Sequence, residues 1–145
     1  MTIYHFCSAK AVKAIRRQGI RIGAVYVPKP GDAKSVELYL GYQWLTIDPE
    51  RKNQSWATRK IVKENRTAYR LTIDLPDDCV LFDRDGLEKE IPGTGILFDG
   101  WPGSENWRVY HGWILPEWIT TCAYGIACLP FCYRRQNTGT RKRKL

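Results

Sequence analysis

Residues 67–75 alternate in polarity, and this pattern constrains the fold more than any other stretch of the chain. The apolar positions are every second one, namely Tyr69, Leu71, Ile73 and Leu75. Successive side chains of a β-strand point to opposite faces of the sheet, so the pattern predicts a strand with one apolar and one mixed face. Arg70 falls on the mixed face.

The first nineteen residues predict a strand followed by a helix. Residues 2–6 have strand character, and Ser8 is a candidate N-cap because its hydroxyl can accept a hydrogen bond from a backbone N–H of the first turn. In the predicted helix 9–18, Val12 and Ile15 share one face. Gly19 suits the left-handed position that ends a helix.

Short strands separated by Gly, Pro and Asp turns make up most of the remaining prediction. We expect extended segments at 20–27, 36–40, 43–46, 80–82, 95–98 and 107–115, and a last strand that begins at Trp118 and runs towards Cys122. The polar stretch 53–65 is expected to be a loop followed by a short helix. One early helix and then mainly strands, without an interdomain linker, predict a single α+β domain in these 145 residues.

Positive charge is concentrated at the C-terminal end of the sequence. The formal net charge is +8, but six basic residues lie between Arg134 and Lys144 with no acidic residue among them, and the rest of the chain is nearly neutral. Such a tail can attract nucleic acid or acidic surfaces, or it can be a solvated, flexible end. We therefore divide the chain into a domain at 1–122 and a C-terminal extension at 123–145 that carries the basic tail.

Five cysteines and two histidines give little support for a metal site. Cys122, Cys128 and Cys132 cluster, but they form no CxxC pair and no fourth ligand lies nearby, whereas structural zinc sites use four. We expect no bound metal and reduced thiols, as is typical of a cytoplasmic protein. No signal peptide is evident, and the apolar run 126–133 is too short to cross a bilayer, so no membrane association is expected.

Three residues have the chemistry of a binding or catalytic site. His5 ends a predicted strand directly before a helix, where it can donate a hydrogen bond into a cleft while the protein holds its other ring nitrogen. Arg70 can hold a phosphate or carboxylate with two parallel hydrogen bonds. Glu105 can stabilise an oxocarbenium ion or accept a proton from a nucleophile. Each also has a structural alternative: a half-buried histidine, a cross-strand partner of an acid, and an exposed turn acid.

Both ends of the domain resemble the ADP-ribosyltransferase-fold family. The Tyr-His-Phe strand at 4–6, the helix after it and the Gly-Ile pair at 19–20 are similar to the opening of RNA 2′-phosphotransferases and of DNA-modifying ADP-ribosyltransferase toxins. Segment 105–119, with Ile-Leu-Pro-Glu at 114–117, resembles the catalytic glutamate strand of those toxins. Segments 43–46, 54–59 and 67–72 resemble uncharacterised bacterial and phage proteins.

This resemblance implies an ADP-ribosyltransferase-like split β-sheet that binds NAD+, as a substrate, in a cleft between its two halves. By position, His5 would bind a ribose hydroxyl or the backbone of NAD+. Trp44 and Thr46 would fall in the second family motif, where an aromatic ring packs on nicotinamide and a hydroxyl orients it. Ser55 and Trp56 would belong to the loop over the site.

The same resemblance implies roles for the two charged candidates. Arg70 would meet the diphosphate or the acceptor, and Glu105 would anchor the nicotinamide ribose and assist transfer. Gly103 stands two residues before Glu105, where protein-arginine modifiers have Glu or Gln. Arginine is therefore disfavoured as the acceptor.

Together these expectations indicate an NAD-dependent mono-ADP-ribosyltransferase that acts on a nucleic acid or a protein, as a toxin or a phage counter-defence factor would. The alternative is a non-enzymatic binding module of the same fold that uses its basic tail to occlude a nucleic-acid or protein partner. A third interpretation is transfer of phosphate from RNA to NAD+ in the same cleft.

Overall fold

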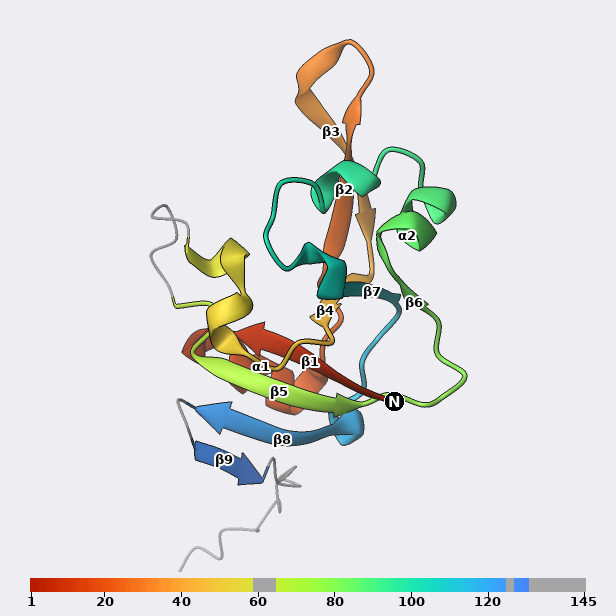
Figure 1. Cartoon of the computed structure of the whole chain (residues 1–145). Coiled ribbons are helices and arrows are strands. Elements are labelled where there is room, and N and C mark those ends of the chain that lie inside the picture. The colour runs from red at the N-terminus through yellow and green to blue at the C-terminus, as the bar shows by residue number, and fades with distance from the viewer. Residues whose placement is uncertain (59–64, 125–126, 131–145) are drawn as a thin grey trace, which may run out of the picture.

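The computed structural model describes residues 1–58, 65–124 and 127–130 (Figure 1). Its strands are β1 (Thr2–Cys7), β2 (Ala24–Lys29), β3 (Asp32–Leu40), β4 (Tyr42–Thr46), β5 (Tyr69–Asp74), β6 (Leu81–Phe82), β7 (Trp107–His111), β8 (Ile119–Tyr124) and β9 (Ala127–Pro130). Its helices are α1 (Ala9–Gln18) and α2 (Arg84–Glu90), with 3₁₀ turns η1 (Arg51–Asn53), η2 (Ser55–Thr58), η3 (Gly95–Leu97), η4 (Ser104–Asn106) and η5 (Pro116–Trp118). The predicted basic tail between Arg134 and Lys144, Cys132 and segment 59–64 lie outside the described residues.

Seven strands form one antiparallel sheet in the order β6-β7-β4-β1-β5-β8-β9, and β2 and β3 form a separate hairpin (Figure 1). β1 pairs with β5 at six positions, and β4 pairs with β7 at five. By contrast, the two central strands β1 and β4 share a single paired position, Tyr4 with Thr46. The prediction of a single α+β domain with an early helix is confirmed.

Helix α1 begins and ends where the sequence predicts. The Ser8 hydroxyl accepts a hydrogen bond from the Ala11 N–H at 3.2 Å, and Val12 and Ile15 are buried. Gly19 has a positive φ of 71°, but its ψ of −163° differs from the left-handed helical value that we expected. Only glycine fits there, since a Cβ would also lie 2.0 Å from the Ile114 carbonyl oxygen.

The buried side chains form two clusters. The first packs α1 against the strands around β1 and includes Ile3, Leu71 and Ile114. The second packs the hairpin and α2 against β4 and β7 and includes Val25 and Phe98. The hairpin projects from this second region, at the end of the molecule away from β8 and β9 (Figure 1).

The segment between β6 and β7 differs most from the prediction. Residues 84–90 form α2, which we did not predict, and the expected strand at 95–98 is instead the 3₁₀ turn η3 followed by Phe98. α2 is capped by Asp83, whose carboxylate accepts from the Gly86 N–H at 2.8 Å, and Leu87 is its one buried residue. A seven-residue helix with one buried side chain has too little apolar periodicity to be recognised, and a four-residue apolar run does not distinguish a strand from a turn.

Candidate functional site

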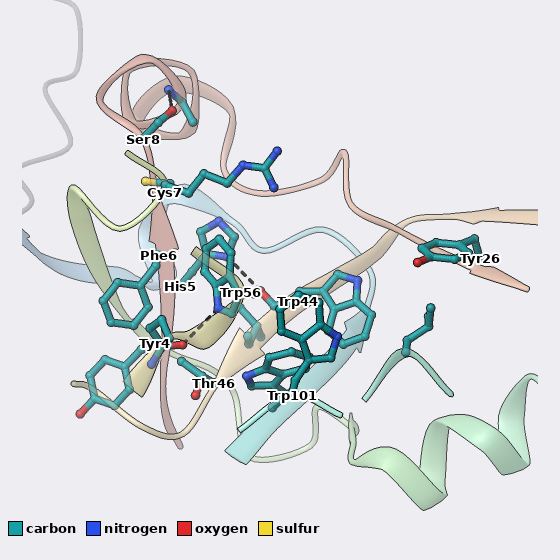
Figure 2. A pocket seen from close by; sticks show the side chains of 16 residues that line it. Tyr4, His5, Phe6, Cys7, Ser8, Tyr26, Trp44, Thr46, Trp56 and Trp101 are labelled. Carbon is teal, nitrogen blue, oxygen red and sulfur yellow. Dashed lines mark hydrogen bonds between the residues drawn. The ribbon is translucent and has the colours of Figure 1, made fainter. Parts of the chain in front are cut away.

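A cavity of about 580 Å³ opens where β1 and β4 meet (Figure 2). Its walls come from β1, the start of α1, the hairpin, β4 and the segments around η2, η3 and β7. The lining residues are Tyr4, His5, Phe6, Cys7, Ser8, Ala11, Tyr26, Trp44, Leu45, Thr46, Gln54, Trp56, Arg66, Leu97, Trp101 and Trp107. The volume lies within the range of ordinary small-molecule and cofactor sites.

His5 links the two central strands beside this cavity. Its Nδ1 lies 2.9 Å from the Trp44 carbonyl oxygen, which can only accept, so Nδ1 carries the hydrogen and donates it. Burial lowers the pKa of His5 below its ordinary value and outweighs the opposing effect of that hydrogen bond. The ring is therefore neutral near pH 7, and Nε2 is a hydrogen-bond acceptor rather than the donor that the sequence suggested.

Aromatic rings pack together along the β4 and β7 side of the cavity. The Trp44 ring lies 5.3 Å from Phe98 and 6.0 Å, edge-on, from Trp107, measured between centroids, and Trp101 lies 6.2 Å from Trp107. The Trp44 indole N–H also donates to the Ala24 carbonyl at 3.0 Å, which fixes the ring against the hairpin. These contacts hold the rings in fixed positions, and the resulting aromatic wall suits a planar ligand.

The η2 region supplies a further ring, which Figure 2 shows beside His5 and Trp44. The indole N–H of Trp56 lies 3.3 Å from the side-chain oxygen of Gln54, and the Gln54 amide donates to the Asp48 and Glu50 carbonyls. Gln54 is itself buried. A network of side-chain and backbone bonds therefore orients Trp56 towards the cavity.

Polar groups in the lining are few. Thr46 accepts a hydrogen bond from the Asp48 N–H at 3.1 Å, a bond that leaves its hydroxyl proton unused. Arg66 carries the one charge among the described lining residues, since His5 is neutral. Cys7 has its pKa raised to about 12 by burial, so its thiol is not a nucleophile near neutral pH.

Four of the five residues predicted to bind the cofactor line this one cavity: His5, Trp44, Thr46 and Trp56. Ser55 is not in the lining. Its hydroxyl donates to the Pro102 carbonyl at 2.8 Å and so ties η2 to the turn before β7.

The two residues predicted to be catalytic also lie outside the lining. Arg70 donates to the Pro49 carbonyl at 3.0 Å, and its guanidinium lies 5.5 Å from the centroid of the Tyr4 ring. Glu105 is exposed on η4, two residues before Trp107. Trp107 lines the cavity, so Glu105 is two residues along the chain from a lining residue.

Sequence reasoning missed most of the other lining residues. Tyr26, Arg66 and Trp101 come from a hairpin, a loop and a turn, and no spacing in the sequence relates them to His5. The one available signal is the six tryptophans in 145 residues, which fit either a pocket for a planar ligand or a Trp-rich core and do not identify individual lining residues.

Two further features bear on the expected chemistry. Among the described residues, no group of three or more His, Cys, Asp or Glu side chains has the arrangement of a metal site. No helix in the described part of the chain is long and apolar enough to span a membrane.

Comparison with known proteins gives no assignment: no family model matches the chain, and no significant match was found among curated proteins or solved structures.

Proposed function

We propose that the protein is an NAD-dependent mono-ADP-ribosyltransferase acting on a macromolecular acceptor. The observation that carries this proposal is the convergence of His5, Trp44, Thr46 and Trp56 on one cavity. These residues come from three segments of the chain, and the family resemblance implied a place at the NAD+ site for each of them.

The pairing of the central strands supports an ADP-ribosyltransferase-like split sheet. β1 is fully paired to β5 and β4 is fully paired to β7, but β1 and β4 meet only at Tyr4 and Thr46. The cavity lies at this junction, and the proposal takes it as the cleft between half-sheets in which the resemblance implies that NAD+ binds.

The lining suits the parts of the dinucleotide. The rings of Trp44 and Trp56 offer faces for a nicotinamide or adenine ring. The Nε2 acceptor of His5 is matched to a ribose hydroxyl, which donates. Arg66 can pair with the diphosphate in place of Arg70, whose guanidinium is bonded to the Pro49 carbonyl and lies against Tyr4.

In the proposed reaction, the bond between C1′ of the nicotinamide ribose and the ring nitrogen breaks, and its electron pair leaves with nicotinamide. An oxocarbenium-like centre develops at C1′ and is attacked by a nucleophile of the acceptor, which loses its proton. Glu105 is the carboxylate to which the proposal assigns stabilisation of this cation and acceptance of the proton. Arg70 acts indirectly, because it positions Tyr4 and the segment around Pro49.

Incubation of the protein with labelled NAD+ and a cell lysate tests the proposal. We expect release of nicotinamide and transfer of label to a macromolecule, and loss of both in Trp44→Ala. Absence of nicotinamide release from folded wild-type protein would contradict the transferase function.

A non-enzymatic binding module on the same scaffold is the second candidate. The specific observation in its favour is that none of the described lining residues is acidic. This candidate predicts that the protein releases no nicotinamide under any condition, and that it instead occludes a protein or nucleic-acid partner.

A further inference from the structure

Helix α1 presents a row of cations on its solvent side. Lys10, Lys13 and Arg17 are exposed and are spaced by three and four residues, so at 3.6 residues per turn they lie on one face of the helix. Val12 and Ile15 are buried on the opposite face. We call Lys10, Lys13 and Arg17 the α1 cation row.

The charges around the row are mostly positive. The first acidic residue of the chain is Asp32, so no acid lies on α1 or on the segments that flank it. Ion pairs in the described part of the chain involve the N-terminal amine and Arg84, and none involves the row. The nearest packed element, η5, contributes one exposed acid, Glu117.

An exposed aromatic ring lies at the C-terminal end of α1. Trp113 is 48% exposed, and the Arg21 guanidinium lies 5.9 Å from its ring centroid. The Trp113 indole N–H donates to the Gln18 carbonyl in the last turn of α1, and the ring packs over Gly19. The ring is therefore held in a fixed position with part of its surface open.

We propose that the α1 cation row and the Arg21–Trp113 pair together bind a single nucleic-acid strand. The row spans about 10 Å along the helix, and its three cations can pair with successive phosphates of one strand. Unpaired bases stack on exposed aromatic rings with little dependence on sequence, and an adjacent arginine strengthens such stacking. DNA and RNA share this chemistry.

An anionic membrane is the less suitable partner. Amphipathic helices that bind lipid insert an apolar face, whereas the apolar face of α1 is buried in the protein core. The surface adjoins the cavity, because Ser8 and Ala11 at the start of α1 line it. Binding of a strand at this surface requires no NAD+, so the inference goes beyond the proposed function.

Fluorescence anisotropy with labelled oligothymidine and oligouridine tests this surface on the full chain. The variant Lys10→Gln/Lys13→Gln/Arg17→Gln is compared with a control variant that removes the same charge from exposed positions on the hairpin and on α2, namely Lys29→Gln/Lys34→Gln/Lys89→Gln. We expect the α1 variant to bind about tenfold more weakly at low salt. The slope of log K against log salt should fall by about 2, while the control keeps the wild-type slope.

A second variant separates stacking from charge. Trp113→Ala should weaken binding of both oligonucleotides about tenfold at an unchanged salt slope, and Trp113→Phe should restore it. Far-UV circular dichroism and thermal melting identify any variant that has lost its fold. If Trp113→Ala is unfolded, the binding of Trp113→Phe is compared with that of wild type instead.

Three results would overturn the proposal. The first is that both triple variants bind the oligonucleotides equally weakly, and the second is that oligonucleotide binding depends only on the basic residues from Arg134 to Lys144. The third is that phosphatidylserine vesicles bind through α1 more tightly than the oligonucleotides do. NAD+ affinity, measured in the same α1 variant, should be unchanged. A protein that binds the oligonucleotides but not NAD+ would contradict the proposed function and leave this inference intact.

Discussion

The cavity wall and the turn before β7 differ in how the protein holds their side chains. On the wall, each predicted cofactor-binding ring has a fixed position: His5 is bonded to the Trp44 carbonyl, Trp44 to the Ala24 carbonyl and Trp56 to Gln54. On the turn, Glu105 is exposed and its carboxylate makes none of the side-chain hydrogen bonds described above. The cavity rings are thus held by the fold itself, whereas no described hydrogen bond orients the Glu105 carboxylate. Under the proposed function, ligand and acceptor would have to orient this carboxylate.

Replacing the carboxylate should produce the largest effect. Glu105→Gln is expected to reduce nicotinamide release by about 10²–10³-fold, because the variant loses charge stabilisation that acts in the transition state. The free energy of unfolding should stay within error, since the side chain is exposed. NAD+ affinity should change far less than turnover, because the carboxylate acts mainly on the cation that forms in the transition state. A turnover assay measures nicotinamide release, calorimetry measures NAD+ affinity, and denaturation measures stability. Glu117→Gln is the matched control at another exposed acid. Equal turnover in wild type and Glu105→Gln would remove Glu105 from the mechanism.

Loss of an aromatic face should have the next largest effect, on binding. Trp56→Ala is expected to weaken NAD+ about tenfold, as removal of one stacking partner costs about 1–3 kcal/mol. Trp113→Ala is the control, because this exposed ring lies outside the cavity lining. If calorimetry gives the same NAD+ affinity for Trp56→Ala as for wild type, the η2 region is not part of the site.

The two arginines should separate ligand binding from stability. Arg70→Gln is expected to lower the free energy of unfolding by about 1–2 kcal/mol, through loss of the bond to Pro49 and the contact with Tyr4. Arg66→Gln should leave stability unchanged, because the side chain is exposed, and should weaken NAD+ several-fold. Chemical denaturation and calorimetry on both variants check this, and the reverse result would restore Arg70 as the phosphate-binding residue.

The smallest effect concerns the protonation of His5. Burial lowers its pKa in the folded protein, so below about pH 6.5 the unfolded chain binds a proton more readily than the folded one. Stability should be complete above pH 6.5 and should fall by up to about 1.4 kcal/mol per pH unit as the pH drops towards the folded pKa. Denaturation at several pH values, compared with His5→Gln, isolates this contribution. A pH dependence identical in the two proteins would show that His5 is not held neutral.

Local signals explain which parts of the fold could be predicted. The helix at 9–18 has a cap, a consistent apolar face and a glycine at its end, and the strand around Leu71 has regular alternation. Residues 84–98 offered no such agreement, since α2 buries only Leu87 and the run 95–98 is apolar without being a strand. The structure of residues 84–98 depends on Phe98, which is 1% exposed and packs in the second core cluster. That cluster brings together segments that are distant in the sequence, so local patterns do not predict it.

The residues of the candidate site also differ in whether the sequence could predict them. The residues at strand positions with a family resemblance, His5, Trp44 and Thr46, meet at the cavity. Arg70 was assigned from the mixed face of its strand, but a strand pattern does not tell a ligand-binding arginine from one bonded to a nearby carbonyl. Arg66 and Trp101 join the lining through loop geometry, which no local pattern encodes.

Calorimetric titration of the protein with NAD+ tests whether the cavity between β1 and β4 is an NAD+ site. We expect saturable one-to-one binding at micromolar strength, and loss of that binding in Trp44→Ala protein that still melts cooperatively. No binding to folded wild-type protein at millimolar NAD+, or equal binding by both proteins, would contradict it.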